Sequence, residues 1–229
     1  MAGQQQHAHV RDDVPFYLSI SGNIGVGKST VCAMMGEALG WPAYYEPVAD
    51  NPYLEDYYRD MPRWAFHLQI YFLSKRFEVQ KDIIERGTSA VQDRTIYEDV
   101  EIFAPVLHRR GAMDTRDYEN YREVFQNMIS FLRPPDLVLY LRCTPDVAMA
   151  RIGARGRDCE KTIPRDFIVE LHEAYEDWVP RARGICPVRV IDTERVNLRD
   201  DHDAQRALLD DIRALHAAKR GRAEREATR

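Results

Sequence analysis

Cysteines are few in this sequence, and long apolar runs are absent. The four cysteines (Cys32, Cys143, Cys159 and Cys186) form no C-x-x-C pair and no zinc-type spacing, which argues against a disulfide framework and favours a reducing compartment. No stretch approaches the ~18 apolar residues of a membrane span, so we expect no membrane partner. Residues 1–14 are polar and contain acids, unlike a signal peptide, and we expect them to form a disordered arm on a cytoplasmic protein.

An excess of positive charge is also lacking. The formal net charge of the 229 residues is −5, so we expect neither a nucleic acid nor an anionic membrane as partner. Neither internal repeats nor a low-complexity linker divide the chain, and its length suits one domain. We predict a single domain over residues 15–217 and a charged, frayed tail over 218–229.

Short apolar segments alternate with longer amphipathic ones. The short segments predict buried strands at 16–20, 43–45, 89–92, 137–141 and 188–191. The longer segments predict helices at 29–39, 62–86, 97–109, 115–132, 164–178 and 201–217. A further helix begins at Thr144, with Pro145 at its first helical position. This order predicts an α/β fold with a central parallel five-stranded sheet flanked by helices.

A glycine-rich loop follows the first predicted strand. The run Gly22-Asn23-Ile24-Gly25-Val26-Gly27-Lys28-Ser29 matches G-x-x-x-x-G-K-[ST] in full, between a strand and a helix. Backbone N–H groups of such a loop surround phosphate oxygens, Lys28 reaches the β- and γ-phosphates, and the Ser29 hydroxyl can ligate Mg²⁺. The loop alone leaves a kinase, a GTPase and an ATPase motor open. The absence of a guanine-reading N-K-x-D weakens the GTPase interpretation.

Charged residues follow the other predicted strands. Glu46 comes after the second strand and Asp93-Arg94 after the third, where α/β proteins place catalytic groups. The alternative for Glu46 is an acid in a surface loop, and the alternative for Asp93-Arg94 is a structural ion pair. Three arginines lie within seven residues in the run 151–157, a pattern suited to a mobile lid that closes over phosphates. A solvated basic helix end is the alternative there.

From about Tyr17 to Asn197 the chain resembles the deoxyribonucleoside kinases, above all the bacterial deoxyadenosine/deoxyguanosine kinases. The resemblance depends on an ordered set of motifs, and the set is far more specific than the glycine-rich loop alone. It comprises 22–30, Glu46-Pro47-Val48, Asn51-Pro52-Tyr53-Leu54, Leu68-Gln69-Ile70-Tyr71-Phe72-Leu73, Asp93-Arg94-Thr95-Ile96-Tyr97-Glu98-Asp99 and Arg151-x-x-x-Arg155-x-Arg157. The resemblance implies a P-loop kinase fold with an arginine-rich lid at about 151–163.

It also implies roles for individual residues in catalysis. Glu46 would be the general base for the 5′-hydroxyl, Arg94 would hold Glu46 and stabilise developing charge, and Lys28 would act on the phosphates. Asp93 would bind Mg²⁺ together with Ser29. The ATP-binding set would be Gly22, Asn23, Ile24, Gly25, Val26, Gly27, Lys28, Ser29, Thr30, Arg151, Arg155 and Arg157.

The resemblance further implies a pocket for the acceptor nucleoside. Tyr58 and Glu160 would bind the 3′-hydroxyl of the deoxyribose, and Phe103 would stack against the base. The substrate-binding set would be Glu46, Leu54, Tyr58, Gln69, Arg76, Arg94, Asp99, Phe103 and Glu160.

The chemistry of Asp99 and Arg76 bears on the base. A carboxylate accepts from an amino group and a guanidinium donates to a carbonyl or ring nitrogen, which suits purines or cytosine better than thymine. We therefore expect phosphorylation of deoxyadenosine and/or deoxyguanosine, with deoxycytidine possible, in nucleotide salvage. A structural Arg76–Asp99 pair on the protein surface is the alternative for these two residues.

Two other functions stay open: a nucleoside monophosphate kinase of the thymidylate type, and a non-catalytic nucleotide-binding regulator. ATP and a deoxynucleoside are the expected ligands. A homodimer through the apolar helices at 62–86 and 115–132 is expected from the family.

Overall fold

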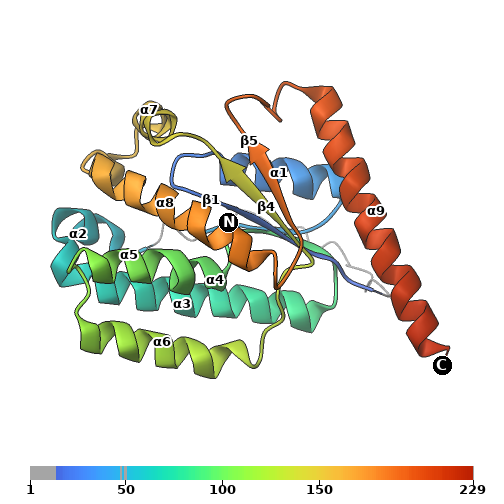
Figure 1. The fold of residues 1–229 in the computed structure, drawn as a ribbon, viewed down its shortest axis with the longest axis horizontal. Coiled ribbons are helices and arrows are strands. Elements are labelled where there is room, and N and C mark those ends of the chain that lie inside the picture. Colours follow the sequence, from blue (N-terminus) through green and yellow to red (C-terminus); the bar gives the residue numbers. More distant parts are fainter. Residues whose placement is uncertain (1–13, 47, 49–50, 229) are drawn as a thin grey trace, which may run out of the picture.

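The computed structural model describes residues 14–46, 48 and 51–228. Its centre is a five-stranded sheet in the order β2-β3-β1-β4-β5, with every pair parallel, which confirms the predicted sheet (Figure 1). The strands are β1 (Tyr17–Gly22), β2 (Ala43–Tyr44), β3 (Ala90–Asp93), β4 (Leu137–Arg142) and β5 (Val188–Asp192). The predicted arm at 1–14 falls outside the described residues except for Val14.

Helices connect the strands and cover both faces of the sheet. They are α1 (Lys28–Leu39), α2 (Leu54–Arg59), α3 (Met61–Arg86), α4 (Ile96–Glu98), α5 (Ala104–Arg109), α6 (Thr115–Ile129), α7 (Pro145–Arg155), α8 (Arg165–Ala182) and α9 (His202–Ala227). A π-helical turn (Asp99–Phe103) joins α4 to α5, and a 3₁₀ turn (Asp158–Glu160) follows α7. In Figure 1, α1 and α9 lie on one side of the sheet, α3, α5 and α8 on the other, and α6 is outermost.

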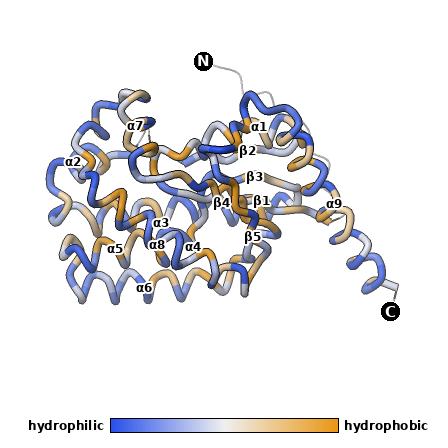
Figure 2. The backbone as a smooth tube through the Cα atoms, turned by 45° about the horizontal axis from the view of Figure 1, so that its top comes forward, coloured by the Kyte–Doolittle hydropathy of each residue, from blue (hydrophilic) through white to orange (hydrophobic). Residues whose placement is uncertain are grey.

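The central strands are buried because both of their faces are covered. All six residues of β1 are buried, and Leu18, Ile20, Leu139 and Leu141 have no solvent exposure. Figure 2 shows hydrophobic residues gathered along these strands. Burial of this apolar surface, at about 25 cal/mol per Å², is the main stabilising contribution of the core.

Parallel strands bring their carboxyl ends to one edge of the sheet. Gly22 ends β1, Asp93 ends β3, and Glu46 follows β2, so the glycine-rich loop and both predicted acidic segments meet at that edge. The lid helix α7 starts beside them: Thr144 accepts a hydrogen bond from the Val147 amide at 3.5 Å, as expected of the predicted N-cap.

Some element boundaries differ from the predicted ones. The terminal helix α9 continues to Ala227, so the prediction that it ends near 217 is wrong, while the fraying of its last residues stays a prediction. Three contacts hold its later part: Lys219 Nζ donates to the Pro15 carbonyl at 2.6 Å and to Asp136 Oδ2 at 2.8 Å, and His216 Nε2 lies 2.8 Å from the Val14 carbonyl. Helix α8 passes through Pro180, and α2 had no predicted counterpart.

Within the described part of the chain, none of the helices combines the length and the apolar composition needed to cross a bilayer.

Candidate active site

The glycine-rich loop closes tightly around the start of α1. Gly25 and Gly27 have φ of 82° and 103°, a region that favours glycine. A Cβ on Gly25 would lie 2.6 Å from the Ala148 carbonyl oxygen of α7, so only glycine allows the loop to approach the lid helix this closely. Lys28 is 7% exposed, and its Nζ donates to the Asn23 carbonyl at 2.8 Å. Burial, together with Arg94, lowers the pKa of Lys28 to about 8.

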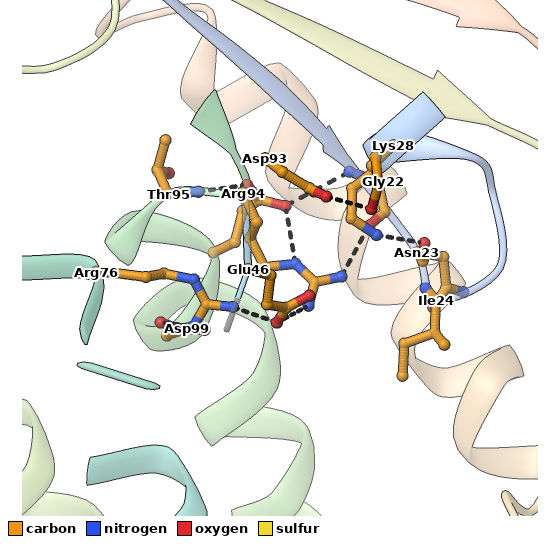
Figure 3. A network of polar contacts seen from close by, with 12 residues as sticks. Gly22, Asn23, Ile24, Lys28, Glu46, Arg76, Asp93, Arg94, Thr95 and Asp99 are labelled. Atoms are coloured by element: carbon orange, nitrogen blue, oxygen red, sulfur yellow. Dashed lines mark hydrogen bonds and ion pairs between the residues drawn. The ribbon is translucent and has the colours of Figure 1, made fainter. Parts of the chain in front are cut away.

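Glu46 lies between two buried arginines. Its Oε1 accepts from Arg76 Nη2 at 2.5 Å and from Arg94 Nη1 at 3.1 Å (Figure 3). Burial alone would raise the pKa of Glu46, but Arg94, Arg76 and Lys28 hold it at about 2, so the carboxylate is ionised at neutral pH. An ionised carboxylate at the edge of a cavity can accept a proton from a bound hydroxyl group.

Arg94 is held in an unusual backbone conformation. Its φ of 63° is the one positive value at a non-glycine residue in the described part of the chain. The guanidinium donates to the Gly22 carbonyl at 3.2 Å and lies 4.4 Å from the centre of the Phe103 ring. Phe103 thus contacts Arg94, and its stacking against a base stays a prediction.

Glu98 is a site residue that sequence reasoning missed. It has no solvent exposure, and it accepts from the Ser21 hydroxyl at 2.8 Å and from the Tyr175 hydroxyl at 2.7 Å. Its carboxylate also forms a capping box with Thr95. The spacing T-x-x-E is the sequence signal that could have found it.

A metal ion fits beside the loop. Ser29 Oγ donates to Asp93 Oδ2 at 2.6 Å, while Asp93 Oδ1 is buried and has no hydrogen-bond partner among the described residues. Mg²⁺ is commonly bound by one or two protein oxygens together with substrate phosphates. The described residues contain no cluster of three or more His, Cys, Asp or Glu side chains that could hold a metal ion.

One cavity of about 500 Å³ joins the loop to the predicted nucleoside residues. Predicted residues on its wall are Ile24, Gly25, Gly27, Lys28, Ser29, Thr30, Glu46, Leu54, Tyr58, Gln69, Arg76, Arg94, Asp99, Phe103, Arg151, Arg155, Arg157 and Glu160. The remaining predicted residues do not line the cavity and are buried: Gly22, Asn23, Val26 and Asp93. Wall residues that were not predicted include Tyr45, Tyr57, Leu68, Phe72 and Phe167.

Arg76 and Asp99 face each other inside this cavity. Arg76 Nη1 lies 2.5 Å from Asp99 Oδ2, and the two side chains are 3% and 2% exposed. The pair is therefore buried and does not lie on the protein surface, and its contact with a base stays a prediction. Burial raises the pKa of Asp99 to about 7, against the opposing effect of Arg76 and Arg94.

The lid arginines already have partners in this conformation. Arg155 and Arg157 both pair with Glu160, which is buried. Arg151 donates to the Thr193 hydroxyl at 2.8 Å and to the Val26 carbonyl at 3.2 Å. The three side chains thus reach the cavity from α7 and the segment after it, and their contact with phosphates stays a prediction.

Fold, loop and lid together define a P-loop kinase. The family model described as deoxynucleoside kinase matches residues 18–216. A deoxyadenosine kinase from Dictyostelium discoideum is 42% identical over 172 residues, which is 75% of this chain and 70% of that protein. A deoxyadenosine/deoxycytidine kinase from Bacillus subtilis is 38% identical over 200 residues, 86% of this chain and 92% of that protein. A solved structure of deoxyadenosine kinase from M. mycoides with bound dATP superimposes with a TM-score of 0.76 at 31% identity, covering 85% and 99% of the two chains.

The chain belongs to the deoxynucleoside kinase family.

Proposed function

We propose that this kinase transfers the γ-phosphoryl group of ATP to the 5′-hydroxyl of a deoxyribonucleoside, which yields the 5′-monophosphate for nucleotide salvage. The observation that carries the proposal is the position of Glu46. Its carboxylate lies on the wall of one cavity, which it shares with Lys28 and Ser29 of the loop and with Gln69 and Asp99, the proposed base-edge residues.

The proposed reaction is an in-line displacement. The 5′-oxygen attacks the γ-phosphorus, the bond from that phosphorus to the β–γ bridging oxygen breaks, and ADP leaves. Glu46 takes the proton of the hydroxyl, while Arg94 stays beside it to stabilise the charge that develops. Lys28 and the lid arginines Arg155 and Arg157 neutralise phosphate oxygens, and lid closure excludes water. Bound Mg²⁺, held by Ser29 and Asp93, would supply further charge neutralisation on the phosphates.

The base end of the cavity supports a purine, or cytosine, as the acceptor's base. Gln69 Oε1 and Arg76 Nε are buried without a hydrogen-bond partner among the described residues, which leaves one acceptor and one donor for a ligand. Adenine and cytosine offer an amino donor beside a ring-nitrogen acceptor, and guanine offers donors beside a carbonyl. The names of the Dictyostelium and Bacillus relatives point the same way. We propose deoxyadenosine and/or deoxyguanosine as substrates, with deoxycytidine next.

A thymidylate-type kinase would need cations free to bind the phosphate of its acceptor. In the described cavity Arg76 and Arg94 both contact Glu46, an arrangement that favours a neutral hydroxyl acceptor over a phosphorylated one. Steady-state ADP production with the four deoxynucleosides and with dAMP tests this proposal. We expect turnover with at least one purine deoxynucleoside and none with dAMP. If none of the deoxynucleosides increases ADP production, the result would instead favour a non-catalytic nucleotide-binding regulator.

We propose in addition a homodimer in the cytoplasm. The dimer is supported by the outer helix α6, which packs on α3. Partly buried apolar residues of both helices border this contact, among them Ile70, Phe77, Val124 and Met128. The cytoplasm is supported by the four cysteines, which are all free thiols, as a reducing compartment allows. Sedimentation at micromolar concentration tests the dimer, and a single monomeric species would contradict it.

A further inference from the structure

One guanidinium group bridges the two halves of the acceptor cavity. Arg76, on α3, donates through Nη1 to Asp99 and through Nη2 to Glu46, each at 2.5 Å. Figure 3 shows its side chain between the two carboxylates. The five N–H donors of arginine lie in one rigid plane. A movement of the guanidinium that shortens its contact with one carboxylate therefore changes its contact with the other.

The second arginine at Glu46 is held from more sides. Arg94 also donates to the Gly22 carbonyl, lies 3.7 Å from Glu98 and stacks on Phe103. Arg76 depends on its two carboxylates and on the Phe72 ring, 4.7 Å away. Arg94 is therefore anchored by more groups than Arg76, although the Arg76–Glu46 contact is the shorter of the two.

A ligand at the base end has a reason to displace Arg76. Arg76 Nε and Gln69 Oε1 are both buried and lack a hydrogen-bond partner among the described residues. Leaving a buried polar group without a partner is unfavourable, so a nucleobase gains by bonding to these atoms and drawing the guanidinium toward itself.

We propose that Arg76 couples the nucleobase to the proton acceptor: an acceptor atom of the seated base draws Arg76 away from Glu46, and Glu46 becomes a competent base only then. Arg76 is in this respect a positioning residue for the reaction as well as a contact of the base. The inference depends on the proposed function, since it assumes that Glu46 serves the 5′-hydroxyl.

The charges around Glu46 support this coupling. The groups that face it are Lys28 from α1, Tyr58 from α2, Arg76 from α3, Arg94 after β3, Asp99 from the π-helical turn and Arg157 from the lid. Two guanidinium bonds on one oxygen make a weak proton acceptor, and a general base works best when its pKa is near the working pH. Loss of one of these bonds strengthens the acceptor without moving Arg94. Base selectivity should then be expressed in kcat as well as in KM.

Deoxyadenosine analogues test the coupling. The 1-deaza, 3-deaza and 7-deaza analogues each replace one ring nitrogen by C–H and keep the sugar. We expect at least one of them to lower kcat about tenfold or more in the unchanged protein. The double variant Arg76→Gln/Asp99→Asn removes the guanidinium together with its buried partner, and in it kcat should be the same for deoxyadenosine and that analogue within about twofold. Lys75→Gln, an exposed change on the same helix, should behave like the unchanged protein.

Three results would overturn the coupling. They are analogues that alter KM alone, a kcat loss that persists in the double variant, and a crystal structure with bound deoxyadenosine in which Arg76 Nη2 stays 2.5 Å from Glu46. The crystal structure does not depend on turnover. We expect it to retain the Arg94–Glu46 contact and to lack the Arg76–Glu46 contact. Failure of any deoxynucleoside to bind or react would instead overturn the proposed function.

Discussion

The Nε atom of Arg94 lies 3.7 Å from the carboxylate of Glu98, a side chain that no solvent reaches. Glu98 also accepts from Ser21, just before the glycine-rich loop, and from Tyr175 on α8. It thereby joins the turn after β3 to the end of β1, where the loop begins, and to helix α8. This network explains how Arg94 keeps a left-handed backbone conformation beside Glu46.

Removal of Glu98 should cost stability. Glu98→Ala leaves the Ser21 and Tyr175 hydroxyls without their acceptor and removes the carboxylate 3.7 Å from the buried Arg94 guanidinium, so we expect the free energy of unfolding to fall by about 3 kcal/mol. Urea denaturation measures this. Glu101→Ala is the matched control, because its exposed pair with Arg181 should contribute less than about 1 kcal/mol. Equal losses in the two variants would contradict the assigned role of Glu98.

Stability should also depend on the ionisation of Asp99. Burial raises the pKa of Asp99 to about 7 from its ordinary value of 3.8, so the folded protein binds this proton more tightly than the unfolded chain does. The contribution is then fully present below about pH 4 and is lost as the pH rises through 7. Between pH 5 and pH 8 the unchanged protein should lose about 2 kcal/mol relative to Asp99→Asn. A difference that stays constant over this range would refute the assignment.

The lid arginines should act on the phosphate donor. Arg155→Ala removes a cation from the cavity wall, and we expect kcat/KM for ATP to fall about tenfold or more while KM for the nucleoside changes little. The control is Arg165→Ala, an exposed residue that pairs with Asp146 away from the cavity. Steady-state kinetics with varied ATP measures this. If kcat/KM for ATP is the same in the two variants, Arg155 does not bind the phosphates.

Magnesium dependence should trace to Ser29 and Asp93. Chelation with EDTA should abolish turnover, and Asp93→Asn should raise the Mg²⁺ concentration needed for half-maximal activity, since the amide is a weaker ligand. Asp203→Asn, at an almost fully exposed position, should leave that concentration unchanged. Titration of Mg²⁺ at fixed ATP makes the comparison, and identical curves for the two variants would exclude Asp93 as a ligand.

Much of the fold could be predicted from local patterns. The apolar runs at β1 and β4 and the sequence 22–29 each specify their structure within a few residues, and their positions agree with the structure. The strand order was not predicted, because pairing of β1 with both β3 and β4 depends on contacts between distant segments. The length of α9 was underestimated for the same reason: Lys219 is held by Pro15 and Asp136, far away in the sequence.

The site was predictable to the extent that its motifs are local. Glu46, Asp93 and Arg94 follow strand ends, and that position alone marks them as candidates. The spacing T-x-x-E marks Glu98 as a helix-capping residue, but its contacts with Ser21 and Tyr175, each 77 residues away, follow no local pattern. Arg76 and Glu46 are 30 residues apart, and helix α2 and most of helix α3 lie between them in the chain. No sequence pattern therefore indicates their contact.

The most direct test of the account is the turnover of Glu46→Gln with saturating ATP and deoxynucleoside, alongside Glu55→Gln, an exposed change on α2. The amide keeps the shape of the side chain but cannot take the hydroxyl proton. We expect kcat to fall by about 10²–10⁴-fold while the Kd for the nucleoside changes little, and Glu55→Gln to remain fully active. Near-normal kcat in Glu46→Gln would contradict the account.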